Sequence, residues 1–431
     1  KRIMKRIGNG RHPISAPLLP IMSLPFLRNS FAVVMVLMST QAIRLHTHYI
    51  ASFFSYYNNK EMFMQAPLPQ TTKQHGPLPK PNFFNTDEWV LLSPDTYPKC
   101  NSPILEKDIT YSLVSQGTEG RLHTLRHTCE RWKGNISLAV YTNKTEDAII
   151  DYLVQDMKCD KKQLTVTCVL PFEELRGKGF PYNYLRRVAL DAAVTSHVVY
   201  LDMDFVPSSD LEESLYSPAV LKEFTHDNKL ALVVAAFEVF GESSNITVPR
   251  SRKINGESQV TAYPFKFFDR NGQHLMKKST RFHAPTNFGR WMTENTNLVY
   301  PLECVTKDFE PYIVVQKCKH LPPPQDQFIS GHDKVSWIRH LVLSGYAFKS
   351  IAGPFCIHLP HARIAGKDFH DYLKRSKTKR AKVQTIKKQF YKHVAAASGK
   401  NVSARMHTCG TGKLNSLLNE YIKVATKINE Q

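Results

Sequence analysis

The sequence predicts an α/β domain with a mostly parallel sheet and helices on both faces, preceded by an N-terminal anchor and a stem. The chain has 431 residues, of which 42% are hydrophobic, a composition that suits a large globular domain and excludes a disordered protein. From Asp108 onward, strand-like and helix-like segments alternate, which is typical of parallel strands joined by helices. No segment repeats with a period of about 20 to 50 residues, so a solenoid is not expected.

Residues 1–43 are expected to form a cytosolic tail and a signal anchor. Five Lys or Arg residues fall within residues 1–11, and the apolar run of residues 31–38 follows them. This run is shorter than the ~20 residues that usually span a bilayer, so a cleaved signal peptide and a buried core helix are the alternatives. Positive charge before the run favours a lumenal location for the rest of the chain.

Two further patterns favour the lumen of the secretory pathway. Four Asn-x-Ser/Thr sites are typical of a glycoprotein. They begin at Asn135, Asn143, Asn245 and Asn401. Eight cysteines lack the Cys-x-x-Cys spacing of zinc or redox sites, so disulfides are expected. Spacing does not fix their connectivity, and the first candidates, which close short loops, are Cys159 with Cys168 and Cys304 with Cys318.

Residues 44–107 are expected to form a stem, and residues 108–431 a single α/β domain. Five prolines from Pro67 to Pro81 favour an extended spacer. Within the domain, strands are expected at 109–115, 136–141, 164–170, 197–201, 230–237 and within 347–358. Helices are expected near 122–132, 148–157, 185–193, 335–343 and 369–394. Residues 249–324 are expected to form long loops with short elements.

A formal net charge of +20 indicates anionic partners, such as acidic glycans, phospholipids, nucleotides or nucleic acid. Eleven Lys or Arg residues lie between Arg363 and Lys392, where Asp368 and Asp371 oppose them. A solvated helix face and an anion-binding surface both explain this run. The glycosylation sites, the cysteines and the anchor argue against nucleic acid as the partner.

Two acidic residues follow an apolar strand. Asp202 and Asp204 come directly after residues 198–201, so the strand period of two places both carboxylates on one side of the sheet edge. Ligands bind at the carboxyl edge of open α/β sheets. Two carboxylates there suit Mn²⁺ or Mg²⁺, which would bridge to the pyrophosphate of a nucleotide. A solvated turn is the alternative.

Two histidines follow a later strand-like run. His358 and His361 flank Pro360, and one imidazole could complete the coordination of the metal while the other contacts phosphate or serves the structure. A structural role for both histidines is the alternative.

Five motifs, in this order along the chain, resemble those of glycosyltransferase family 49. They read LDMDFVP from Leu201, AAFE from Ala235, HAPTNF from His283, DFEPYIVV from Asp308 and IHLPHA from Ile357. The resemblance implies a GT-A fold, a UDP-sugar donor, a divalent metal and inversion at the anomeric carbon. It further implies transfer of a sugar, with glucuronic acid preferred, to a glycan or glycoprotein acceptor. The protein would be a single-pass type II protein of the Golgi membrane.

The resemblance also assigns residues to the site. Asp202, Asp204 and His358 match the metal ligands, and His361 is an alternative ligand or a contact of the donor. Arg186 and Asn183 are expected near the donor phosphates, where a guanidinium can bind two oxygens at once; an exposed helix arginine is the alternative. Four more residues are expected to line the site: His283, Asn287, Glu310 and Tyr312.

One segment departs from the family pattern. Where relatives tend to read Gly-Phe-Gly-x-Asn-Lys, residues 328–334 are one residue shorter and have Asp333 in place of an amide. An inverting transferase needs a base, and Asp333 is the first candidate, ahead of Glu310 and Glu238. Capping of the following helix is the alternative role of Asp333. Transfer of N-acetylglucosamine or xylose, and an inactive GT-A fold that binds acidic glycans, are the alternative functions.

Overall fold

The computed structural model describes residues 81, 83, 91–101, 103–176, 179–239, 262–264, 282–329, 332–359, 377–397 and 405–429. The expected anchor and most of the expected stem lie outside these residues. Among the helices that are described, none combines the length and the apolar character needed to span a bilayer.

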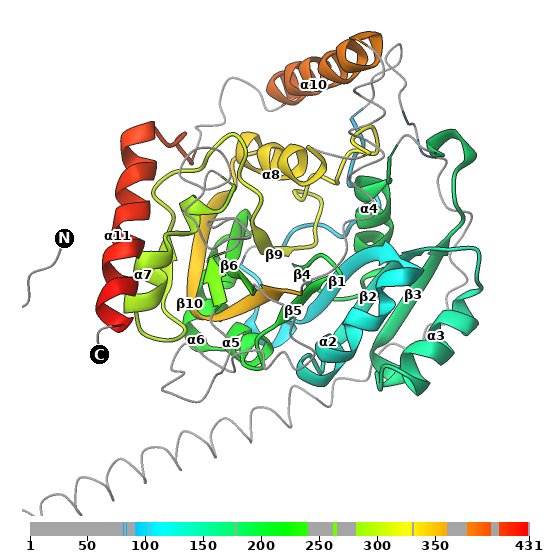
Figure 1. Ribbon diagram of the computed structural model, residues 1–431, viewed down its shortest axis with the longest axis horizontal. Helices are drawn as coiled ribbons and strands as arrows, with labels where there is room; N and C mark the ends of the chain where they lie inside the picture. Colours follow the sequence, from blue (N-terminus) through cyan, green and yellow to red (C-terminus); the bar gives the residue numbers. More distant parts are fainter. Residues whose placement is uncertain are drawn as a thin grey trace, which may run out of the picture. The chain divides into compact units, whose positions relative to one another are not determined.

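A ten-stranded sheet forms the centre of the described fold (Figure 1). Its main path runs in the order β3-β2-β1-β4-β9-β6-β10-β5, with β7 paired to β6 and β8 paired to β10. The strands are β1 Tyr111–Thr118, β2 Asn135–Tyr141, β3 Leu164–Val169, β4 His197–Tyr200, β5 Phe205–Pro207, β6 Leu230–Val239, β7 Ala262–Pro264, β8 Val299–Pro301, β9 Tyr312–Gln316 and β10 Ala347–His358.

The sheet is mixed, so the expectation of a mostly parallel sheet is wrong in this respect. β9 runs antiparallel to both β4 and β6, and β5 runs antiparallel to β10. The other strands of the main path share one direction. Residues 312–316 were expected to lie within loops, yet they form a central strand. An antiparallel strand needs no crossover helix, so the strand-helix alternation that revealed the parallel strands is missing here.

The described helices surround this sheet. They are α2 Leu125–Arg131, α3 Glu146–Gln155, α4 Tyr182–Ala192, α5 Leu211–Leu215, α6 Pro218–His226, α7 Phe288–Thr293, α8 Asp333–Leu343, α10 Lys377–Ala397 and α11 Thr411–Asn429. Short 3₁₀ turns are η1 Glu106–Asp108, η2 Glu119–Thr124, η3 Lys161–Gln163, η4 Glu173–Leu175 and η6 Ala284–Thr286. The helix expected over 369–394 is described from Lys377.

Helices cover both faces of the sheet, as the sequence predicts. On one face, Ser137 of β2 donates through Oγ to the carbonyl of Ala189 in α4, at 2.8 Å. On the opposite face, Tyr111 of β1 donates through its hydroxyl to the carbonyl of Leu215 in α5, at 3.0 Å, and its ring lies against Phe224 of α6. Neighbouring register pairs of β1 and β2 alternate between these faces.

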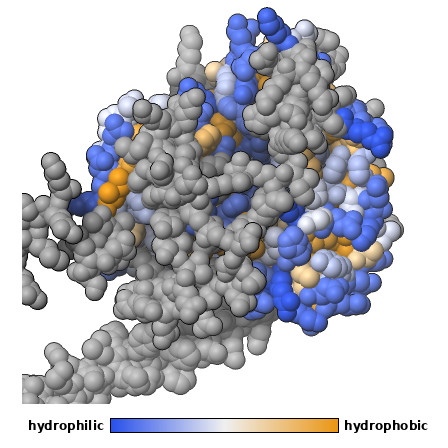
Figure 2. Space-filling model, in the orientation of Figure 1, coloured by the Kyte–Doolittle hydropathy of each residue, from blue (hydrophilic) through white to orange (hydrophobic). Residues whose placement is uncertain are grey.

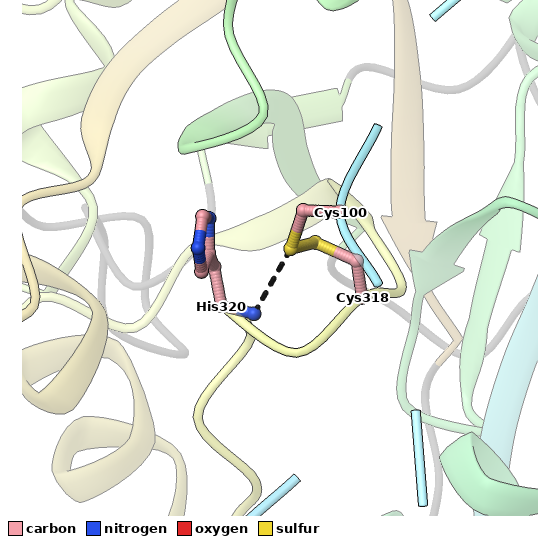
Figure 3. Close-up of side chains that lie close together, drawn as sticks. All are labelled: Cys100, Cys318 and His320. Carbon is pink, nitrogen blue, oxygen red and sulfur yellow. Dashed lines mark hydrogen bonds between the residues drawn. A yellow bond between two sulfur atoms is a disulfide. The ribbon is translucent and has the colours of Figure 1, made fainter. Parts of the chain in front are cut away.

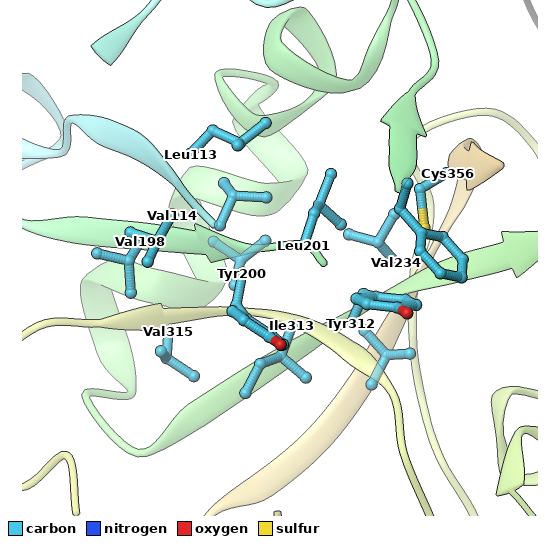
Figure 4. Packing of buried hydrophobic residues seen from close by; sticks show 14 of the residues in the cluster. Leu113, Val114, Val198, Tyr200, Leu201, Val234, Tyr312, Ile313, Val315 and Cys356 are labelled. Carbon is cyan, nitrogen blue, oxygen red and sulfur yellow. The ribbon is translucent and has the colours of Figure 1, made fainter. Parts of the chain in front are cut away.

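Buried apolar side chains pack together where the central strands β4, β6 and β9 meet. Figure 4 shows Val198 and Tyr200 of β4 beside Ile313 and Val315 of β9, with Val234 of β6 nearby. All five side chains are at most 1% exposed. On the face drawn in Figure 2, the coloured surface is mostly hydrophilic with small, separate hydrophobic patches. The close packing of β4, β6 and β9 in the core holds in place the strand ends that carry the functional side chains.

The folded unit begins before Asp108, which corrects the expected boundary of the stem. Tyr97 is 4% exposed and donates through its hydroxyl to Asp191, at 2.9 Å. Cys100 forms a disulfide with Cys318, and Ile104 is buried. Residues 91–107 therefore pack as part of the compact unit that spans His75–Gln431.

The disulfides also differ from the first candidates. The bonds join Cys100 with Cys318, Cys129 with Cys159 and Cys304 with Cys409. Cys168 and Cys356 are unpaired. Strand β9 lies between residues 304 and 318. An extended strand rises about 3.3 Å per residue, so it separates Cys304 from Cys318 by more than a disulfide can span. Cys168 lies within strand β3, and its expected partner Cys159 is bonded to Cys129 instead.

Candidate active site

The strand directions bring the candidate residues to one edge of the sheet. β4, β6 and β10 end at this edge, whereas the antiparallel β9 begins there. Asp202 follows β4, Tyr312 opens β9 and His358 closes β10. The Tyr312 hydroxyl donates to Oδ2 of Asp202, at 2.9 Å. The mixed sheet therefore assembles residues from distant parts of the chain.

Asp202 is held by protein donors on both carboxylate oxygens. Gln116 donates to Oδ1 at 2.9 Å and the Tyr200 hydroxyl donates to the same atom. Nζ of Lys334 lies 2.7 Å from Oδ2. Burial alone would raise the pKa of Asp202, but the positive charges of Lys334 and Arg186 outweigh it and lower the pKa to about 2. Asp202 is therefore a fixed anion.

Asp204 has a different environment, because it faces an imidazole. Its Oδ2 lies 3.7 Å from Nε2 of His358, and both side chains are 23% exposed. Arg121 lies farther away, with Nη1 at 4.0 Å from the same oxygen. The ring of His358 rests against Phe205, and the Leu359 amide donates to the carbonyl of Asp204. A carboxylate and an imidazole in this arrangement are ligand types that suit Mn²⁺.

Among the described residues, one group of three side chains has potential metal-ligand atoms within 4.8 Å of one another. It does not include Asp202, Asp204 or His358. This group is Cys100, Cys318 and His320. Figure 3 shows that its two sulfur atoms are joined in a disulfide, while the backbone amide of His320 donates to Sγ of Cys100. A disulfide offers no thiolate, which is the form of cysteine that binds metals. The group is therefore structural, and Asp202, Asp204 and His358 do not form an equally tight set.

Arg186 is buried, so its alternative role as an exposed helix arginine is wrong. Its side chain is 1% exposed, and Nη2 lies 3.2 Å from Oδ2 of Asp333 and 3.8 Å from Oδ1 of Asp202. The guanidinium also stacks over the ring of Tyr200, at 4.7 Å, and donates to Oδ1 of Asn183. Arg186 thus connects the two acidic positions from α4.

Asn183 joins α4 to the segment that leads into α8. Its side chain is fully buried, and Nδ2 donates to the carbonyls of Gln325 and Asp333, at 3.1 Å each. These protein partners occupy the amide, so its direct contact with a donor stays a prediction. The described geometry gives Asn183 a positioning role.

Asp333 does not cap α8, so this alternative is wrong. It is the first residue of α8, and the N-cap residue before it is His332. Burial raises the pKa of Asp333, the Arg186 charge opposes this, and the Glu310 charge adds to it. Glu310 is anchored by its amide, which donates to the carbonyl of Phe282 at 2.9 Å. The negative charges of Glu310 and Asp202 therefore both act on the Asp333 carboxyl group.

Comparison with known proteins identifies the family. A family model described as "Glycosyl-transferase for dystroglycan" matches residues 156–397, which is more than half of the chain. The chain belongs to glycosyltransferase family 49. Its sequence is 32% identical to "Xylosyl- and glucuronyltransferase LARGE2s" of Danio rerio over 59% of this chain and 32% of that protein. It is 30% identical to "Xylosyl- and glucuronyltransferase LARGE1" of Homo sapiens over 59% of this chain and 31% of that protein.

These matches span about a third of the length of the curated relatives. Among solved structures, GalNAc-T7 with UDP, GalNAc and Mn²⁺ is similar with a TM-score of 0.34 and 11% identity, over 62% of this chain and 48% of that chain. S. aureus TarS 1-349 in complex with UDP is similar with a TM-score of 0.34 and 13% identity, over 73% of this chain and 71% of that chain.

The remaining residues that the resemblance to family 49 places at or near the site lie in different surroundings. The rings of His283 and Tyr312 stack at 6.4 Å, so His283 borders the Asp202 environment. Asn287 caps α7 by accepting from the Arg290 amide. Glu238 pairs in register with His358 on the neighbouring strand. His361 lies outside the described residues.

Sequence reasoning missed Lys334 and Gln116, which both contact Asp202. Lys334 is 7% exposed, and its ammonium lies 3.7 Å from the ring centre of Tyr312. Gln116 is a buried polar residue near the end of β1. A polar residue within an otherwise apolar strand, at the edge where ligands bind, is the signal that identifies Gln116.

Proposed function

We propose that this protein is a metal-dependent, inverting GT-A glycosyltransferase that transfers glucuronic acid from a UDP donor to a glycan acceptor. The observation that carries the proposal is the Asp204–His358 pair, 3.7 Å apart beside the fixed Asp202 anion, in a family 49 chain. The curated relatives are named xylosyl- and glucuronyltransferases, which supports glucuronic acid as the sugar and makes xylose the alternative.

The residues present fit a divalent metal. Asp204 and His358 are the two ligands that face each other, and their partial exposure leaves room for oxygen ligands from a diphosphate. A metal held there would neutralise charge on the UDP leaving group. Asp202 is saturated by Gln116, Tyr200, Tyr312 and Lys334, so we assign it the task of fixing the turn that presents Asp204.

We assign the base to the neighbouring acids Asp333 and Glu310. A base must deprotonate the acceptor hydroxyl, and its efficiency is best when its pKa approaches the working pH. The pKa of Asp333 is raised by burial, with Glu310 adding to the rise. Arg186 holds the Asp333 carboxylate at 3.2 Å and so orients it toward the Asp202 side of the site. Direct contacts of Arg186 and His361 with the donor stay predictions.

We also propose a Golgi location with the catalytic domain in the lumen. The apolar run at residues 31–38 and the glycosylation sites support it. Three disulfides fit an oxidising compartment.

The test is a sugar-transfer assay on the full chain with Mn²⁺, a panel of UDP-sugars and glycan acceptors. UDP-glucuronic acid should give the highest UDP release that depends on the acceptor. Asp204→Asn and His358→Gln should each lower kcat at least ~100-fold, because either change removes a ligand that fixes the metal. Asp147→Asn, an exposed position at the start of α3, is the matched control and should retain full activity.

Mn²⁺ affinity, measured by calorimetry without donor, gives a second readout. Both site variants should weaken it about 10-fold or more, whereas Asp147→Asn should leave it unchanged. Unchanged Mn²⁺ affinity in Asp204→Asn would contradict the ligand assignment. Absence of transfer with every donor, together with retained binding of acidic glycans, would support the inactive glycan-binding alternative.

A further inference from the structure

The basic helix α10 packs against α8, the helix that begins with the candidate base Asp333. Ile386, Phe390 and Val394 of α10 are buried at a spacing of four residues, which places them on one face of the helix. The Phe390 ring contacts Phe328 at 5.1 Å and His340 of α8 at 5.6 Å. Figure 1 shows α10 lying beside α8. This packing fixes which side of α10 faces outward.

The sequence of α10 contains six Lys residues, one Arg residue and no acidic residue. Lys382, Lys388 and Lys392 are exposed. In Figure 2 the surface at the top of the view, where Figure 1 places α10, is hydrophilic. Repulsion among like charges on one helix opposes its folding, so the composition indicates an anionic partner, though not where that partner binds.

The junction of α8 and α10 gives the location. The guanidinium of Arg339 lies over the ring of Tyr391, at 5.0 Å. Its Nε is buried and has no hydrogen-bond partner. Within the part of the chain that the structure describes, no carboxylate lies within ion-pair distance of Arg339.

Lys387 adds a second cation to this junction. It precedes Tyr391 by one helical turn and is half-buried. Burial lowers the pKa of Lys387, and the Asp308 charge opposes this shift. Neither the described ion pairs nor the described hydrogen bonds involve its ammonium group. Lys387 and Arg339 both lie near His332. Burial, together with the positive charges of Lys387 and Arg339, lowers the pKa of His332 to about 3.

His332 connects the junction to the candidate site. Its Nε2 lies 2.6 Å from the Tyr391 hydroxyl. The next residue is Asp333, which is one of the two candidate bases and begins α8. Arg339 and Lys387 therefore lie close to the residue that precedes the candidate base Asp333, on the α10 side of the candidate site.

We propose that Arg339, Lys387 and Tyr391 form an acceptor subsite that binds an anionic group of the glycan, either a carboxylate or a phosphate. A guanidinium binds two oxygens of such a group, an ammonium adds a point charge, and the exposed part of an aromatic ring can pack against a sugar. The subsite extends the proposed transferase function, on which its role in catalysis rests.

Binding without donor or metal tests the subsite independently of turnover. The probes are a tetrasaccharide of alternating glucuronic acid and N-acetylglucosamine, its carboxyl-reduced counterpart, and maltotetraose with and without one phosphate. Calorimetry on the full chain should show tighter binding of a charged probe than of its neutral counterpart. Whichever charged probe binds more tightly identifies the anion.

The variants are Arg339→Gln, Lys387→Gln and their combination, with Lys388→Gln as the matched control on the exposed face of the same helix. Each single change should weaken binding of the charged probe roughly tenfold, the scale of one charge-assisted hydrogen bond. Binding of the neutral probe and the effect of Lys388→Gln should both be small. In the transfer assay the same changes should raise the KM for the acceptor and leave the KM for the UDP-sugar unchanged.

The outcomes separate this inference from the proposed function. A chain that binds the charged probe through Arg339 and Lys387 but transfers no sugar would retain the subsite and lose the transferase proposal. Equal binding of charged and neutral probes would overturn the subsite. So would equal losses in Lys388→Gln and Lys387→Gln, or tighter binding to vesicles of anionic phospholipid than to either charged glycan with the same dependence on Arg339.

Discussion

At the residue scale, two acidic residues of one motif have different tasks. Asp202 accepts from two tyrosines and Gln116 and pairs with Lys334. Asp204 faces His358 at 3.7 Å, and both side chains are part-exposed. The Asp202 side chain is itself 24% exposed, but that of its partner Lys334 is only 8% exposed, so loss of the carboxylate leaves a buried charge uncompensated. A pair in which both members are part-exposed contributes little stability. The two residues should therefore respond differently to the same substitution.

We expect Asp202→Asn to lower the free energy of unfolding by about 3 kcal/mol, because the buried Lys334 would lose its anion, whereas Arg186 would keep Asp333. Asp204→Asn should cost less than about 1 kcal/mol while it weakens Mn²⁺ binding. Urea unfolding in the absence of metal measures both values. Equal losses in the two variants would contradict the division of tasks.

At the element scale, the antiparallel β9 brings Tyr312 and Glu310 to the edge where β4 delivers Asp202. A parallel strand in the same place would present its opposite end there. Helices α7 and α11 also pack closely against each other. Gly289 of α7 lies against α11, where an added Cβ would be 2.8 Å from Cγ of Glu420 and 3.0 Å from the Tyr421 nitrogen.

Gly289→Ala should destabilise the protein by about 1 to 3 kcal/mol, because the backbone of α11 must move away to admit the methyl group. Gly412→Ala is the matched control, since an added Cβ there meets no atom within 4 Å and alanine favours the helix. Thermal unfolding of the two variants measures the difference. A Gly289→Ala protein as stable as the Gly412→Ala protein would show that α11 does not need this contact.

At the scale of the whole molecule, buried histidines make stability depend on pH. Burial lowers the pKa of His197 to about 3 and that of His340 to about 4. Unfolded histidine has a pKa of about 6.5, so below this pH the unfolded chain binds protons that the folded chain does not. Each such group contributes stability that is complete above about pH 6.5 and is lost as the pH falls.

His197→Leu should make the free energy of unfolding less dependent on pH between about 6.5 and 4, by up to about 1.4 kcal/mol per pH unit relative to the unmodified chain. Urea unfolding at several pH values measures the slope. The exposed His123→Gln should leave the slope unchanged. A slope in His197→Leu equal to that of the unmodified chain would show that the folded and unfolded chains protonate His197 to the same extent over this pH range.

The sequence alone identified the strands and helices between residues 109 and 201, because hydrophobic periodicity is a local property. It also identified the acidic pair, which follows directly from the apolar strand before it. The basic helix was predicted from its charges, although its buried stripe at Ile386, Phe390 and Val394 explains how it docks.

Only the tertiary structure decided how distant segments meet. In the folded protein, β9 lies between β4 and β6, Cys304 is bonded to Cys409, and the Asp333 carboxylate forms an ion pair with Arg186. The tertiary structure also separated the tasks of Asp202 and Asp204 by placing Lys334 on one of them. Each of these contacts joins residues far apart in the chain, and such pairing depends on strand direction and packing that no local pattern records.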